Sequence, residues 1–211
     1  MKKVLIFVLV LGLTFVTGSM TLGKGLFGVT DLMDTPTTAT LGPGAFGLGL
    51  NVAEADQFFG NLDLGLANDL EMGIAFYGYK DFYGSRDTDV TVRGKFRLLH
   101  ESSSQPALAI GIEDIGNDDF SPYIVLSKTF QESGVRGYIG AGGGAFDGLF
   151  GGISKNFKVT GGAVKQVQLL LEADSNNLNV GTRLMLDNQT SINFGLMDME
   201  NWMIGATFHL K

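Results

Sequence analysis

The sequence predicts an all-β chain that folds into an antiparallel barrel of about twelve strands. Apolar and polar residues alternate through most of the chain after Ala45, which places them on opposite faces of strands. Turn residues interrupt the alternation about every ten residues. The alternating segments are roughly eight to eleven residues long, which is the length of strands that cross a membrane.

The clearest strand is the segment 89–98. Its residues alternate without interruption between a charged face and an apolar face. The charged face carries Asp89, Thr91, Arg93, Lys95 and Arg97, and the apolar face carries Val90, Val92, Gly94, Phe96 and Leu98.

The N-terminus predicts export. Met1-Lys2-Lys3 is basic, and an apolar run of about thirteen residues follows, which is too short to cross a bilayer as a helix. Small residues end this segment, so residues 1–19 are interpreted as a cleaved signal peptide. The alternative is an uncleaved membrane anchor. In both cases the rest of the chain leaves the cytoplasm.

Residues 20–44 form an N-terminal segment without a clear period. Turn signals occur at 34–36 and 42–44. One interpretation is a linker, and the other is a plug that enters the barrel lumen. Leu32 and Met33 are among several apolar residues that would be costly to leave in water.

Residues 45–211 are predicted to form the barrel. Alternation is clean in the first five strands and the last four, but 137–144 and 150–157 are rich in glycine and follow the pattern less well. The expected strands span residues 45–52, 61–66, 70–77, 89–98, 108–113, 123–130, 137–144, 150–157, 167–174, 178–186, 191–196 and 202–210.

The polar face is expected to line the lumen. It carries mostly small residues with a few charges of both signs, which suits a crowded interior better than a solvated surface. Facing lipid, each basic side chain would cost about 2–4 kcal/mol. The basic row is interpreted either as a selectivity stripe for an anionic solute or, preferably, as structural pairing with carboxylates. The lumen-lining candidates are Asp63, Glu71, Arg93, Lys95, Arg97, Glu113, Glu172, Asp174 and Arg183.

Export together with a closed sheet predicts the outer membrane, with lipid as a partner and both chain ends in the periplasm. The last strand is similar to the signal read by the barrel-assembly machinery, with Gly205, Phe208 and Leu210 at its expected positions. The alternative is a soluble secreted β-protein with an apolar core. Aromatic residues at strand ends could form an interfacial girdle, namely Tyr77, Tyr79, Phe82, Tyr83 and Trp202.

Several segments, in order, resemble YjbH-like outer-membrane proteins: 28–39, then 112–116 with 121–128, then 171–174 with 179–183. The resemblance implies an outer-membrane β-barrel linked to exopolysaccharide production or export, with a polysaccharide or small solute as possible partner. Members of that family are often longer, and many are lipoproteins, whereas this chain has no cysteine. The roles considered are a small channel or accessory barrel in export, and a non-conducting structural or adhesive barrel.

Neither an enzymatic site nor a cofactor or metal site is expected. The chain has two histidines, and His100 beside Glu101 and Ser102 is better explained as a polar strand end than as a catalytic triad. The acidic loop 114–119 lacks the spacing of a calcium-binding loop. A net charge of −7 argues against a nucleic-acid partner.

Overall fold

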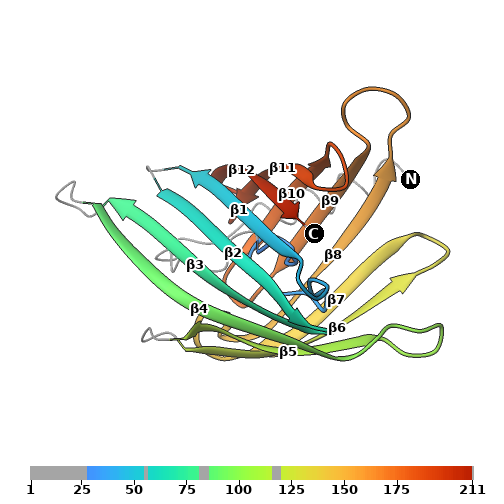
Figure 1. Ribbon diagram of the computed structural model, residues 1–211, viewed down its shortest axis with the longest axis horizontal. Helices are drawn as coiled ribbons and strands as arrows, with labels where there is room; N and C mark the ends of the chain where they lie inside the picture. Colours follow the sequence, from blue (N-terminus) through green and yellow to red (C-terminus); the bar gives the residue numbers. More distant parts are fainter. Residues whose placement is uncertain (1–27, 55–56, 81–85, 116–119, 211) are drawn as a thin grey trace, which may run out of the picture.

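The computed structural model describes residues 28–54, 57–80, 86–115 and 120–210. Twelve strands within these ranges form one closed antiparallel barrel, in which β1 pairs with β2 on one side and with β12 on the other (Figure 1). The predicted all-β barrel of about twelve strands is therefore confirmed. The predicted signal peptide, residues 1–19, lies outside the described residues, as do residues 20–27 of the N-terminal segment.

Every strand pairs with its neighbours in the sequence, and the connections are short, from residues 68–69 between β2 and β3 to residues 100–106 between β4 and β5. The strands are β1 (Phe46–Ala53), β2 (Gln57–Ala67), β3 (Leu70–Lys80), β4 (Arg86–Leu99), β5 (Ala107–Ile115), β6 (Ser121–Phe130), β7 (Val135–Gly142), β8 (Gly148–Lys158), β9 (Gln166–Ala173), β10 (Leu178–Met185), β11 (Thr190–Met197) and β12 (Asn201–Leu210). A 3₁₀ turn, η1 (Gly144–Phe146), lies between β7 and β8. None of the described segments is a helix long and apolar enough to cross a membrane.

The apolar face of the sheet is the outer face of the barrel. In the β2–β3 pair, for example, Leu62 lies opposite Ile74 and Leu64 opposite Met72, and all four side chains are exposed. The alternation seen in the sequence thus separates an apolar exterior from a polar interior. Large exposed apolar side chains occur on every strand, including Leu50, Leu62, Ile74, Val90, Ile110, Ile124, Ile139, Ile153, Leu169, Leu178, Phe194 and Trp202.

A few large apolar side chains point inward and form a small internal cluster. Leu170 interrupts the pattern of β9, and Met203 stands on the polar face of β12; both are buried in a cluster that also contains Leu32 and Met33. Tyr77 joins this cluster and packs edge-on against Phe59. The inclusion of Tyr77 in an outer aromatic girdle is therefore wrong, because it shares the inward face of β3.

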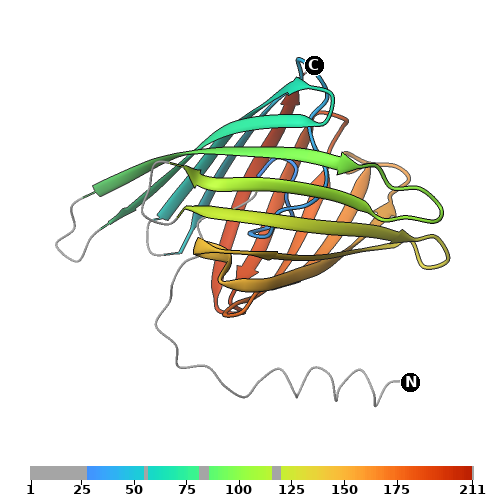
Figure 2. The ribbon, with the colours of Figure 1, turned by 90° about the horizontal axis from the view of Figure 1, so that it is seen from below.

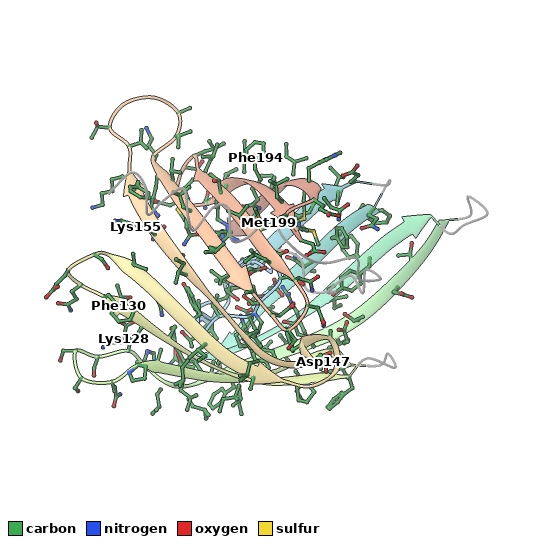
Figure 3. The ribbon with its side chains drawn as sticks, turned by 180° about the vertical axis from the view of Figure 1, so that it is seen from behind. Lys128, Phe130, Asp147, Lys155, Phe194 and Met199 are labelled. Atoms are coloured by element: carbon green, nitrogen blue, oxygen red, sulfur yellow. The ribbon has the colours of Figure 1, made fainter. Side chains whose placement is uncertain are left out.

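The two ends of the barrel carry different turns, and both chain ends of the barrel lie at one of them. The end at which β1 begins and β12 ends also carries the β6–β7 and β8–β9 turns, and Lys128, Phe130 and Lys155 lie toward it in Figure 3. Asp147 and Met199 lie toward the opposite end. The first end is called the terminal end below. Both chain ends of the barrel domain therefore lie on the same side, as an even number of strands requires.

Candidate functional site: a lumen closed by the N-terminal segment

Residues 28–44 are called the lumen segment below; residues 28–41 lie inside the barrel, and residues 42–44 are exposed where the segment leads into β1. Figure 2 shows this segment, in blue, between the barrel walls. Residues 28–38 are buried apart from the partly buried Thr30, although they form neither helix nor strand. Buried main-chain N–H groups need acceptors. Inward-facing carboxylates of the barrel wall supply them.

Glu172 on β9 is the main anchor of the lumen segment. Its carboxylate accepts hydrogen bonds from the main-chain N–H groups of Met33 at 2.9 Å, Asp34 at 2.7 Å and Thr35 at 3.2 Å. The hydroxyl of Thr35 donates to it at 2.9 Å, and the side-chain amide of Asn179 on β10 donates at 2.9 Å. Glu172 is fully buried, so these donors replace the water that the carboxylate has lost.

Two further wall carboxylates hold the flanks of the segment. Glu71 on β3 accepts a hydrogen bond from the Leu41 N–H at 2.8 Å and one from the Thr30 hydroxyl at 2.8 Å. Asp63 on β2 accepts from the Val29 N–H at 3.3 Å. The segment is therefore fastened to β9 through Glu172 and to the neighbouring strands β2 and β3 through Asp63 and Glu71.

The basic row of β4 meets these acids in the lumen. Arg93 forms a two-pronged ion pair with Asp63, with Nε at 2.8 Å from Oδ1, and its Nη1 lies 3.4 Å from Asp31 of the lumen segment. Lys95 Nζ lies 2.6 Å from Asp31 and 3.8 Å from Glu71. These side chains are buried, so the charges stabilise one another directly rather than through water.

Two of the remaining candidates border this core: Glu113 lines the same small cavity as Asp31, Arg93 and Lys95, and Arg183 reaches the main chain of Asp31. Glu113 on β5 is buried facing the interior, and Arg183 on β10 donates to the Asn193 side chain at 3.0 Å and to the Leu32 carbonyl at 3.1 Å. Arg97 binds Asp69 in the β2–β3 turn, with Nε 2.8 Å from Oδ1. Asp174 lies just past the end of β9 and accepts two turn N–H groups at 2.7 Å. The assignment of Asp174 to the lumen lining is therefore wrong, because the strand ends before it.

His100 also lies in the group at the β2–β3 turn. Its Nε2 is 2.9 Å from Asp69, while the Ser102 hydroxyl accepts the Gln105 N–H within its own turn. Hydrogen bonds from Arg97 and from His100 hold the pKa of Asp69 below its ordinary value. Of the acidic loop 114–119, residues 116–119 lie outside the described residues.

Sequence reasoning missed Asp31, which both Arg93 and Lys95 contact. Its signal was an acid directly before the apolar pair Leu32 and Met33, but spacing alone could not connect it to a strand sixty residues later. Three inward glycines also have a role that the sequence did not show. A β-carbon would lie 2.4 Å from Val29 at Gly47, 2.6 Å from Leu32 at Gly152 and 2.6 Å from Met33 at Gly181. Because glycine has no side chain, these three positions leave room for the lumen segment.

A cavity of about 680 Å³ lies at the terminal end of the barrel, between the lumen segment and the wall. It is called the vestibule below. Its floor includes Thr30 to Leu32 and its walls include side chains of β7 to β12. Within the described residues, the lumen thus has a closed central part and an open chamber at its terminal end.

The sequence compared with known families gives a clear match. Residues 24–174 match the model of the family YjbH, described as exopolysaccharide biosynthesis protein YbjH. The chain belongs to the YjbH family. The match includes the lumen segment, the basic row of β4 and Glu172, while β10 to β12 lie beyond it. The resemblance noted in the sequence is therefore confirmed. No curated protein matches this YjbH-family chain.

Several solved structures are similar to this YjbH-family barrel at low sequence identity. The KdgM porin is 10% identical, with a TM-score of 0.48, and the alignment covers 78% of this chain and 98% of that one. The N-terminal β-barrel domain of Pseudomonas aeruginosa OprF is 11% identical, with a TM-score of 0.28, over 81% and 100% of the two chains. Pseudomonas putida OprB at low pH is 9% identical, with a TM-score of 0.31, over 79% and 91%. These likenesses are too weak to carry an argument about function.

Proposed function

We propose that this protein resides in the outer membrane with its apolar exterior in lipid. Large apolar side chains are exposed on all twelve strands, and an apolar surface of that extent is not found on monomeric proteins in water. A closed barrel satisfies its main-chain hydrogen bonds internally, which lipid requires. The terminal end would then face the periplasm, and the last strand would be read by the barrel-assembly machinery.

We propose further that the protein serves exopolysaccharide biosynthesis or export as an accessory barrel whose lumen is closed. The observation that carries this proposal is the lumen segment, which fills the centre of the barrel and is held there by Glu172, Glu71 and the Asp31–Lys95 ion pair. The family match supplies the link to exopolysaccharide. No enzymatic activity is proposed.

A small channel is the second candidate, in which the lumen segment acts as a gate. One observation favours it: the segment is held mainly by side chains and not by strand pairing, so it could leave without opening the barrel. The open vestibule would then be the periplasmic mouth of the pore.

A disulfide lock distinguishes the two candidates. Thr38 of the lumen segment and Ser127 of β6 have their hydroxyl oxygens 2.5 Å apart, so a Thr38→Cys/Ser127→Cys variant of this cysteine-free chain would tie the segment to the wall. For a closed accessory barrel we expect no conductance in planar bilayers, oxidised or reduced. Conductance that appears in the reduced variant and the natural protein, and disappears on oxidation, would establish the channel instead.

Location is tested separately. We expect the protein in the outer-membrane fraction, and we expect its gel mobility to change on boiling, as for a detergent-resistant barrel. Recovery in the soluble periplasmic fraction would overturn the membrane proposal and restore the soluble β-protein interpretation.

A further inference from the structure

The vestibule has the dimensions of a ligand site. Its volume of about 680 Å³ falls within the range of roughly 300–1,000 Å³ that is common for pockets that bind small molecules. The lumen segment closes its inner end, and the β6–β7 and β10–β11 turns border its mouth. A molecule entering from the terminal end would therefore stop against the lumen segment.

Four side chains that line this chamber each carry a polar atom that is covered in the empty chamber and has no hydrogen-bond partner among the described residues. The atoms are Thr40 Oγ1, Arg136 Nε, Gln168 Oε1 and Ser191 Oγ. Buried polar atoms in native proteins are nearly always paired, and each unpaired one costs free energy. The four come from the lumen segment, β7, β9 and β11, so distant parts of the chain bring them to one chamber. Each of these side chains has to turn for its polar atom to reach a ligand in the chamber, and the four then provide both donors and acceptors, as a hydroxyl-rich ligand needs.

Two arginines and two aspartates line the chamber, and the aspartates are held by their partners at shorter range than Arg136 is held by Glu101. Arg136 and Arg183 both line it. The two lining acids are already engaged: Asp31 by Lys95 and Arg93, and Asp187 by the main-chain N–H groups of Gln189 and Thr190 at 2.7 and 2.6 Å.

Arg136 contacts the barrel wall and also lines the chamber. Its Nη2 donates to Ser127 at 2.8 Å and lies 3.5 Å from Glu101, while its Nε makes no bond. The guanidinium lies 5.7 Å from the centre of the Tyr138 ring, which also lines the chamber. An aromatic ring beside a cation and hydroxyl-binding groups suits a sugar that carries a carboxylate.

We propose that the vestibule binds an acidic saccharide, with a uronate carboxylate on Arg136 and sugar hydroxyls on Gln168, Ser191 and Thr40. This proposal deepens the exopolysaccharide function and rests on it for the choice of ligand. It concerns the terminal end only, and it requires no movement of the lumen segment.

The test is isothermal titration calorimetry of the full-length barrel in detergent with a tetrameric uronate, and with maltotetraose as the neutral counterpart. We expect saturable binding of the uronate and much weaker binding of maltotetraose. Gln168→Leu and Arg136→Gln are each expected to weaken uronate binding about ten- to hundredfold. Lys158→Gln removes an exposed charge at the same end of the barrel, at a residue that does not line the vestibule, and should leave affinity unchanged.

The Gln168→Leu variant separates a loss of uronate binding from a loss of folding stability. Gln168 Oε1 has no hydrogen-bond partner in the part of the chain that the structure describes, so its removal breaks no bond there, and the thermal unfolding midpoint should not fall. Absence of uronate binding, or equal binding by the natural protein and both variants, would overturn the proposal. Equal affinity for maltotetraose would overturn the acidic specificity. The function proposed above fails on different readouts, namely fractionation and conductance, so the two can be judged separately.

Discussion

The carboxylate of Glu172 accepts the main-chain N–H of Asp34 at 2.7 Å, although the two residues are 138 positions apart. Neighbouring amides and the Thr35 hydroxyl converge on the same carboxylate. A buried carboxylate normally needs a basic partner. Here main-chain N–H groups of the irregular lumen segment take the place of a basic side chain. The carboxylate thereby gains hydrogen-bond donors, and the buried N–H groups gain an acceptor.

Glu172→Gln should loosen the lumen segment. One carboxylate oxygen becomes an NH₂ group that cannot accept, so donors from the segment lose their partner, and hydrogen bonds to a charged group are worth roughly 1.5–3 kcal/mol each. We expect the free energy of unfolding in urea to fall by about 2–3 kcal/mol. Glu200→Gln, in the exposed β11–β12 turn, is the control and should have no effect. Equal stability of both variants would show that Glu172 is not an anchor.

Arg93 and Arg97 lie on the same face of β4 but should differ in their contribution to stability. Arg93→Gln leaves Asp63 and Asp31 buried with less compensation, and breaking a buried pair costs about 3–5 kcal/mol. Arg97→Gln removes a partly exposed pair with Asp69 and should cost much less, because water screens the pair. Chemical unfolding of the two variants measures the difference. A larger loss for Arg97→Gln would contradict the paired-lumen arrangement.

Acid should weaken the β2–β3 turn. The bonds from Arg97 and His100 hold the pKa of Asp69 low in the folded protein. A carboxyl group with a depressed folded pKa contributes stability above its unfolded pKa of about 4, and loses it as pH falls through the folded value. The natural protein should therefore unfold at a higher temperature than Asp69→Asn at pH 7, with a smaller gap at pH 3. A difference in unfolding temperature between the two proteins that grows as the pH falls would contradict this prediction.

Leu170 and Leu171 are adjacent on β9 but face opposite ways, inward and outward. In lipid vesicles, Leu171→Arg should destabilise the barrel by about 2–4 kcal/mol, because a basic side chain is costly in the membrane. Leu170→Ala should cost about 2–5 kcal/mol through a cavity beside Met33. If Leu171→Arg has no effect on stability in vesicles, the exterior does not face lipid.

The barrel itself could be predicted from the sequence to a large extent. The alternation in β2 and β4 reports which residues share a face, and the absence of charge on one face reports which face avoids water. The irregular positions could not be interpreted in the same way. Leu170, Met203 and Tyr77 are large side chains on the inward face, where mostly small and charged residues were expected, and they pack there against the lumen segment or beside it.

The sequence by itself determined the strand pattern, the apolar exterior and the supply of acids and bases for the interior, because these follow from a period of two along each strand. Only the tertiary structure decided that the lumen is closed and that Asp31 meets Lys95, that Glu172 receives the amides of the segment, and that Asp174 stays in a turn. The physical reason is that residues 28–44 have no periodicity of their own. Their place is set by main-chain donors that can be satisfied only where the closed barrel gathers carboxylates from strands far apart in the sequence.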